Sequence, residues 1–406
     1  MTSIRLLRIR LALALLALTL AAFGTGSARA ACGEEGSDEV AFQGSGKLLL
    51  AACGPKEQQA VLRLDSTGQL DRSFAEDGSL GPWTGNRAAH LAVTPEGKVL
   101  VQMTLGKGRN RRVVLRRFSA NGKLDRSFAG GKATILKGGS APEDIHVFAQ
   151  PQGTAVVAYY GEWDGCYGND CAERTNYLQL LRWSVTGKLI AEASYYTEDW
   201  KLRDITMAPN GDLLVAGGSS EYGKATYLRT KPNLKPRAKH NFREGPFDPG
   251  VARVLAGPGE SFFGSSGFGP AQHYLSDWSI DEAFGEAGAA TCGTKEASVS
   301  PRASLPSGGF LATGGDADCG LAEFGPDGRL DPAFGSGGSV NLEALGLTGP
   351  QFRLQSIAVG PNGEIAIAFA DPNKPIVRIS RFTPEGQLET GFGTDGTVTV
   401  TGAGPA

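Results

Sequence analysis

Short stretches in which apolar and polar residues alternate run along the chain, and tight turns separate them. In the C-terminal part, residues 354–359 alternate in this way, a Pro-Asn-Gly turn follows at 361–363, and residues 364–370 run back. Two further stretches, 377–382 and 397–401, complete the unit. Alternation over a few residues between turns that contain Gly and Pro is typical of half-buried antiparallel strands. Because no window has a convincing helical period, we predict an all-β fold.

The unit recurs along the chain at intervals of roughly fifty residues. Its marker is a Pro-x-Gly turn, found at 95–97, 151–153, 209–211, 306–308 and 361–363, with weaker copies at Pro258-Gly259 and Gly44-Ser45-Gly46. Seven units of four strands predict a seven-bladed β-propeller of four-stranded antiparallel blades, an arrangement that leaves few exposed sheet edges. We assign residues 31–406 to this single domain. Whether the strand near Thr397 shares a blade with residues 38–43 stays open.

Most units carry a second signature after their third strand. The sequence Gly-x-Leu-Asp-x-x-Phe occurs at 68–74, 122–128 and 328–334, with variants at 280–284 (no Gly) and 386–392 (Glu for Asp). It has decayed in the third and fourth units, at 189–191 and 234–236. Together with the Pro-x-Gly turn upstream, the signature resembles the delta-60 repeat, a bacterial β-propeller-type repeat. The resemblance covers essentially all of residues 31–406, and it implies a propeller without implying a particular activity.

The acid of this signature suggests a row of catalytic carboxylates, but a structural role explains it better. An Asp just after a turn accepts backbone N–H groups and fixes the loop, while Leu and Phe fill the space between sheets. Since nearly every unit has the acid, we predict that it serves folding.

The first thirty residues have the composition of a secretory signal peptide. Arginines at 5, 8 and 10 precede an apolar run at 11–22, and Ala28-Arg29-Ala30 supplies the small residues of a cleavage site. The apolar run is shorter than the roughly twenty residues of a membrane span. Cys32 raises the alternative of a lipoprotein, but Arg29 stands where a lipobox has an aliphatic residue. We therefore predict a secreted or cell-envelope protein with no membrane span after cleavage.

Charge and cysteine content narrow the class further. Removing the signal peptide with its four arginines takes the formal net charge from −2 to −6. An acidic chain lacks the basic face that nucleic acids need, so we predict no nucleic-acid partner. An even number of cysteines in an exported chain predicts disulfides, and pairing neighbours along the chain is the simplest of fifteen arrangements: Cys32–Cys53, Cys166–Cys171 and Cys292–Cys319. A zinc site fits poorly, because no His lies at a ligand spacing from any Cys.

The Pro-x-Gly turn also aligns the units. If the strand before it is innermost, the residue five positions before the proline falls at one level of the channel, and its occupants are His90, His146, Asp204, Arg253, Pro301 and Ser356. The next position is mostly apolar: Leu91, Val147, Ile205, Val254, Arg302 and Ile357. An equivalent position with ionisable groups in four of six units is unlike a packing position. We take His90, His146, Asp204, Arg253 and Ser356 as candidate ligand-binding residues, with solvated strand ends as the alternative explanation.

Some of these side chains allow chemistry beyond binding. His90, His146 and Asp204 are candidate catalytic residues, because a His near an Asp supports general acid–base catalysis. The same three are candidate ligands of a divalent cation. Arg253 suits a carboxylate or a phosphate.

An insertion at residues 161–176 contains Asp164, Asp170 and Glu173 around Cys166 and Cys171. Their spacing is not that of an EF-hand calcium loop. We predict a hairpin tip closed by a disulfide, with contact of Trp163 and Tyr167 with a partner as the alternative.

Function follows by exclusion. The chain has no Gly-x-Ser-x-Gly elbow, His-Glu-x-x-His motif or P-loop. We therefore predict a monomeric binding scaffold whose partner is a protein, a glycan or a small molecule at the channel mouth. The alternative is a hydrolase or lyase that acts there through His90, His146 and Asp204.

Overall fold

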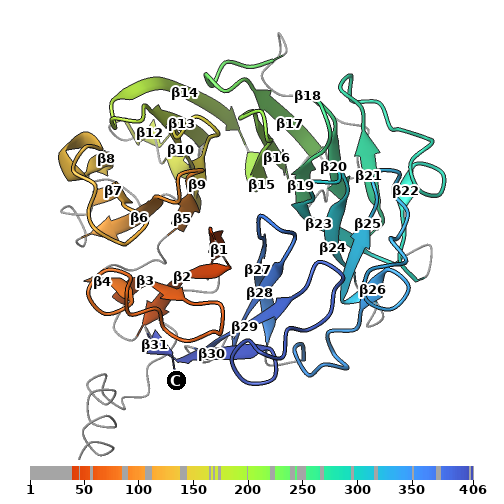
Figure 1. Cartoon of the computed structure of the whole chain (residues 1–406). Helices are drawn as coiled ribbons and strands as arrows, with labels where there is room; N and C mark the ends of the chain where they lie inside the picture. Colours follow the sequence, from red (N-terminus) through yellow and green to blue (C-terminus); the bar gives the residue numbers. More distant parts are fainter. Residues whose placement is uncertain are drawn as a thin grey trace, which may run out of the picture.

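The computed structural model describes residues 39–405 except for the short segments 45, 55–57, 85–89, 106–111, 138–143, 164–165, 168–169, 172–174, 199, 220–224, 238–242, 245–252, 266–268, 294–296, 315–318, 350–351, 372–375 and 402–403. The predicted signal peptide lies outside the described residues. Seven antiparallel sheets stand as blades in a ring around a central channel (Figure 1). The predicted seven-bladed all-β propeller is confirmed.

The strands follow one another from the channel outward in six of the blades and in the same order in the third, which contains an inserted hairpin. The first three blades comprise β1 (Val40–Gln43), β2 (Lys47–Gly54), β3 (Gln58–Leu64) and β4 (Ser79–Thr84); β5 (His90–Val93), β6 (Val99–Leu105), β7 (Arg112–Phe118) and β8 (Ala133–Lys137); and β9 (Asp144–Ala149), β10 (Ala155–Trp163), β13 (Thr175–Trp183) and β14 (Leu189–Glu198). The inserted hairpin is β11 (Cys166–Tyr167) and β12 (Asp170–Cys171).

The remaining blades are built alike. They comprise β15 (Trp200–Met207), β16 (Leu213–Ser219), β17 (Ala225–Thr230) and β18 (Arg243–Glu244); β19 (Arg253–Ala256), β20 (Phe262–Ser265), β21 (Ala271–Tyr274) and β22 (Ala289–Ala290); β23 (Val299–Ser304), β24 (Phe310–Gly314), β25 (Leu321–Phe324) and β26 (Ser339–Val340); and β27 (Arg353–Val359), β28 (Ile365–Ala370), β29 (Ile376–Phe382) and β30 (Thr397–Thr401), to which β31 (Gly404–Pro405) is added.

Each blade buries both of its faces against its neighbours. In the second blade, Leu91 and Val101 pack against the first blade, whereas Leu100 and Leu115 pack against the third. A strand in the middle of such a blade has no solvated side, so it is apolar at consecutive positions, as β28 is. This burial is the main stabilising term, because apolar surface leaves water on both faces.

The signature Phe packs against the turn glycine of the following blade. A Cβ at that glycine would lie no more than 3.0 Å from a ring atom in three pairs: Gly122 with Phe74, Gly328 with Phe284 and Gly386 with Phe334. These glycines also have φ between +75° and +79°, a region that side chains disfavour. The signature is therefore an inter-blade contact that needs Gly on one side and Phe on the other.

The two decayed units break this pattern in a complementary way. The third unit has Ala193 where the Phe would stand, and the following blade has Leu234 at the turn; the fourth unit has His240, and the following blade has Trp278. Leu234 and Trp278 keep the positive φ, +67° and +77°, and their side chains pack against the preceding blade. A large turn side chain thus fills the space that a missing Phe leaves.

The first and seventh blades close the ring with the same kinds of contacts that join the other neighbouring blades. Strand β1 is the innermost strand of the first blade and β30 belongs to the outer side of the seventh, so these two strands share no blade. At the junction Gly393 donates its N–H to the carbonyl of Thr67 at 2.8 Å, just as Ala75 donates to Asn121 elsewhere. One apolar cluster spans the first and seventh blades.

Cys292 and Cys319 form a disulfide between the fifth and sixth blades, as predicted. Cys32 and the side chains of Cys53, Cys166 and Cys171 lie outside the described residues, so their pairings stay predictions. The backbone of the predicted hairpin places position 166 opposite position 171. In the part of the chain that the structure describes, no helix is long and apolar enough to cross a membrane.

Candidate functional site

The five candidate ligand-binding residues lie at one level of the channel, on the innermost strands of five blades. Each is paired with the corresponding residue of its second strand: His90 with Gln102, His146 with Ala158, Asp204 with Ala216, Arg253 with Ser265, and Ser356 with Ala368. Alignment from the turn therefore located structurally equivalent positions.

Glu39 completes this level in the first blade. Its backbone carbonyl accepts a hydrogen bond from Ala51, which places it where the other five stand. Its Oε1 lies 2.7 Å from Nδ1 of His90. Sequence alignment missed Glu39 because the first unit has no proline at its turn; counting back from the glycines of that turn would have found it. We call Glu39, His90, His146, Asp204, Arg253 and Ser356 the polar ring.

The side chains of His90 and His146 each pair with a carboxylate side chain, and the two imidazole rings are neighbours. The ring centroids lie 6.4 Å apart. Asp144, two residues before His146 on β9, has its Oδ2 3.0 Å from Nε2 of that histidine. Sequence reasoning did not single out Asp144, because it lies off the aligned position.

The charges in this part of the channel shift one another's protonation. Burial alone would raise the pKa of Asp144, but His146 and His90 outweigh it and lower that pKa to about 2. Burial alone would lower the pKa of His146, but Asp144, Glu39 and Asp204 raise it. His146 and Asp144 are therefore a charged pair over a wider pH range than isolated side chains would be.

Asp204 and Arg253 form the next part of the polar ring. Oδ1 of Asp204 is 3.6 Å from Nη1 of Arg253 and accepts the N–H of Ile205 at 3.0 Å. Burial raises the pKa of Asp204, although Arg253 counteracts it. The Arg253 side chain remains 42% exposed, so it is open to a ligand in the channel.

Three members of the polar ring also join blades. Each accepts the N–H of the residue that follows the ring position in the next blade: Glu39 from Leu91 (2.8 Å), Asp204 from Val254 (2.8 Å) and Ser356 from Val40 (3.4 Å). These contacts join the first blade to the second, the fourth to the fifth and the seventh to the first. Assembly thus explains part of the polar pattern, whereas the two histidines and Arg253 make no such bond among the described residues.

The sixth blade departs from the alignment. A bulge in β23 places Ser300 opposite Thr313, at the level of the polar ring, and leaves Arg302 as the extra residue beside Pro301. Bulges commonly redirect a side chain in this way. Nε of Arg302 donates to Oγ1 of Thr313 at 2.9 Å.

A cavity lies at the other end of the inner strands. It has a volume of about 900 Å³ and is lined by several turn prolines, among them Pro95, Pro151 and Pro209, together with Phe42 and Met207. No member of the polar ring lines it. The channel therefore has two chemically different ends, one charged and one largely apolar.

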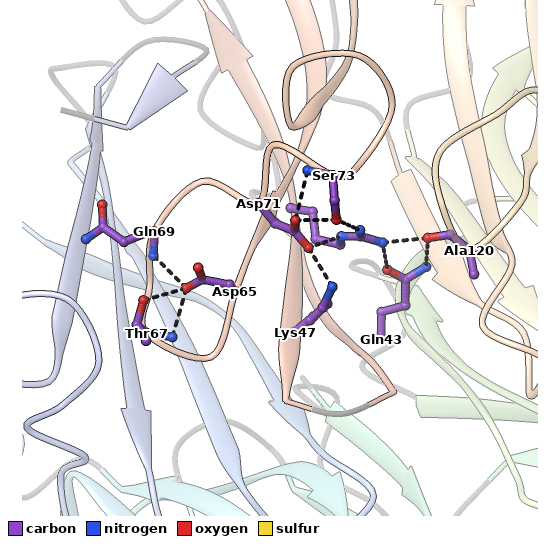
Figure 2. Close-up of polar contacts among 9 residues, drawn as sticks. Gln43, Lys47, Asp65, Thr67, Gln69, Asp71, Ser73 and Ala120 are labelled. Atoms are coloured by element: carbon purple, nitrogen blue, oxygen red, sulfur yellow. Dashed lines mark hydrogen bonds and ion pairs between the residues drawn. The ribbon is translucent and has the colours of Figure 1, made fainter.

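The signature acids serve the fold, as predicted. Oδ1 of Asp71 accepts the N–H of Ser73 at 3.0 Å, and Oδ2 accepts from Lys47 at 2.7 Å and from Arg63 at 2.9 Å (Figure 2). Arg63 and Gln43 then bond the carbonyl of Ala120 in the second blade. Every oxygen of Asp71 is therefore occupied in holding a loop and a blade junction.

Metal coordination gains no geometric support from the described residues, where no group of three His, Cys, Asp or Glu side chains is placed to hold an ion. His90 and His146 are each directed to a carboxylate of their own, and Asp204 is bonded to backbone N–H groups. The divalent cation stays a sequence-based prediction.

Comparison with known proteins adds the fold alone. No family model matches the chain, and no curated protein matches it. Prolyl oligopeptidase B from Galerina marginata, solved with a 25mer macrocyclization substrate, is similar over 86% of this chain and 50% of its own, with 10% identity and a TM-score of 0.50. The Dos1 propeller is similar over 88% of this chain and 79% of its own, with 11% identity and a TM-score of 0.49. The resemblance to the delta-60 repeat stays a prediction based on the motifs.

Proposed function

We propose that this protein is an exported binding scaffold that takes its ligand at the polar ring. The observation that carries the proposal is the meeting of ionisable side chains from five consecutive blades, Glu39, His90, His146, Asp204 and Arg253, at one level of the channel. Binding sites are concave and combine a few converging polar groups with a rigid frame. A ligand here is a small molecule, or a side chain or sugar that a protein or glycan inserts into the channel.

Thermal shift screening tests this proposal with residues 31–406. A ligand that binds only the folded protein raises its melting temperature by mass action, so a panel of sugars, amino acids, carboxylates and phosphates can be ranked. We expect His146→Gln to weaken the binding of such a ligand at least tenfold, because it removes the imidazole N–H donor of His146 from the polar ring. Glu96→Gln is the matched control at the apolar end, whose cavity Glu96 lines. If Glu96→Gln weakens the binding of that ligand and His146→Gln does not, the polar ring is not the binding site.

Hydrolase or lyase activity is the second candidate, and the paired histidines favour it. His90 with Glu39 and His146 with Asp144 are two His–carboxylate pairs whose rings are neighbours. Such pairs orient an imidazole for proton transfer. Turnover of a lactone, glycan or phosphoester that disappears in His146→Gln would establish the enzyme in place of the scaffold.

Export rests on residues 1–30 and is tested separately. Fused to a reporter that folds only outside the cytoplasm, these residues are expected to give an active, shortened product. A reporter that stays inactive and uncleaved would contradict the proposed location.

A further inference from the structure

The polar ring continues into the sixth blade with a second arginine. The β23 bulge sets Arg302 next to the ring level, and its Nε is anchored on Thr313. Strands β19 and β23 are joined nearer to their turns, where Oγ of Ser304 donates to the carbonyl of Ala256 at 2.7 Å. Arg253 and Arg302 thus come from adjoining inner strands and reach the same part of the channel.

The acids that face these arginines balance only one of the two positive charges. Among the described residues the interacting acid is Asp204, at 3.6 Å from Arg253, and two backbone N–H groups also occupy it. Glu39 and Asp144 are directed to His90 and His146 on the opposite side. Burial and the charge of Arg253 lower the pKa of Arg302 to about 10, although Asp204 counteracts them, so one carboxylate faces both guanidinium groups.

A buried hydroxyl beside Arg253 is without a hydrogen-bond partner among the described residues. Ser265 stands directly opposite Arg253 in the sheet and is 2% exposed. Its Oγ has no hydrogen-bond partner among the described residues. In four of the other blades the corresponding second-strand residue is an alanine, namely Ala51, Ala158, Ala216 and Ala368. Since buried polar groups nearly always find a partner, this hydroxyl indicates a polar group still to be received.

We propose that Arg253 and Arg302 bind a carboxylate group of the ligand between the fifth and sixth blades. The inference rests on the proposed function and names the ligand's chemistry. A guanidinium matches a carboxylate with two parallel N–H···O bonds. One negative charge offsets the excess positive charge beside Asp204, whereas a doubly charged group would meet repulsion from that carboxylate. The Ser265 hydroxyl is then available as a further donor.

Acetate is the probe, and acetamide is its uncharged counterpart. Both are titrated into residues 31–406 at constant ionic strength, because salt screens exposed charges, and the melting temperature is followed. We expect acetate to stabilise the protein and acetamide not to. We expect Arg302→Gln to weaken acetate binding about tenfold, the loss of one charge-assisted contact. Arg253→Gln, at a partly exposed position, provides a second variant in case Arg302→Gln folds poorly.

Arg329→Gln is the matched control, since Arg329 is an exposed turn residue of the same blade and its loss changes net charge equally. Equal effects of Arg302→Gln and Arg329→Gln on acetate binding would overturn the proposal, and so would tighter binding of inorganic phosphate than of acetate. A neutral ligand that depends on His146 but not on Arg302 would leave the proposed function standing and remove the carboxylate.

Discussion

Exchanging the two partners of an inter-blade contact gives the sharpest test of how this propeller is assembled. Phe334 is 1% exposed in the core between the sixth and seventh blades. A Cβ at Gly386 would lie 2.8 Å from both Cε2 and Cζ of its ring, and the three nearest atoms all belong to Phe334. Leu234 in the fourth blade and Trp278 in the fifth show that a large turn residue can replace the Phe of the preceding blade. We therefore expect Phe334→Ala and Gly386→Leu to compensate each other.

The magnitudes follow from the two environments. Phe334→Ala should cost about 4 kcal/mol, because it leaves a cavity in a close-packed core. Gly386→Leu should cost about 3 kcal/mol, from a φ of +75° and from overlap with the ring. Independent effects would together cost about 7 kcal/mol. In the double variant the Leu fills the cavity and meets no ring, so we expect about 4 kcal/mol and a coupling of about 3 kcal/mol.

Urea unfolding of the four proteins, followed by circular dichroism, measures this coupling. Gly346→Leu is the control for the backbone: Gly346 has φ +70° and no atom within 4 Å of its Cβ position. We expect this control to cost about 1 kcal/mol. The reasoning is refuted if the two costs simply add, or if Gly386→Leu is no worse than Gly346→Leu.

Three further predictions concern charge and covalent structure. Burial and Asp331 raise the pKa of Glu323 to about 7, so the folded protein loses stability as pH rises from 4.5 to 7. Glu323→Gln should remove this loss: in urea unfolding, the free energy of unfolding of the variant minus that of the unmodified protein should be about 2 kcal/mol higher at pH 8 than at pH 5. Asp144→Asn should lower the pKa of His146 in an NMR titration, because it removes the main group that raises it, and an unchanged pKa would refute the pair. Cys319→Ser should cost about 3.5 kcal/mol in thermal unfolding, since it opens a loop of 27 residues; a loss below about 1 kcal/mol would contradict the entropic estimate.

The polar ring was predictable only in part. Counting back from a proline located His90, His146, Asp204, Arg253 and Ser356, because residues at the same number of positions from the turn of an extended strand lie at equal depth. The count could not find Glu39, whose turn has no proline. It also could not tell that Asp204 and Ser356 bond the next blade, since such contacts join residues far apart in the chain.

Arg302 shows the limit of alignment most clearly. In the sequence it occupies an apolar packing position. A one-residue bulge reverses the direction of a side chain without leaving a mark in the local pattern. Asp144 was missed for a different reason: it lies two positions from His146 on the same face of β9, and the count from the turn considers one position per strand.

The sequence by itself determined the strands, their turns and the number of blades, because alternation and tight turns are local properties that recur seven times. It also assigned the Asp of the signature to folding, since an acid needed in nearly every unit serves what the units share. Tertiary structure decided which Phe meets which glycine, how Leu234 and Trp278 replace a missing Phe, and which charges face one another across the channel. Those features depend on contacts between blades, and distances between blades are not encoded in the spacing of residues along one of them.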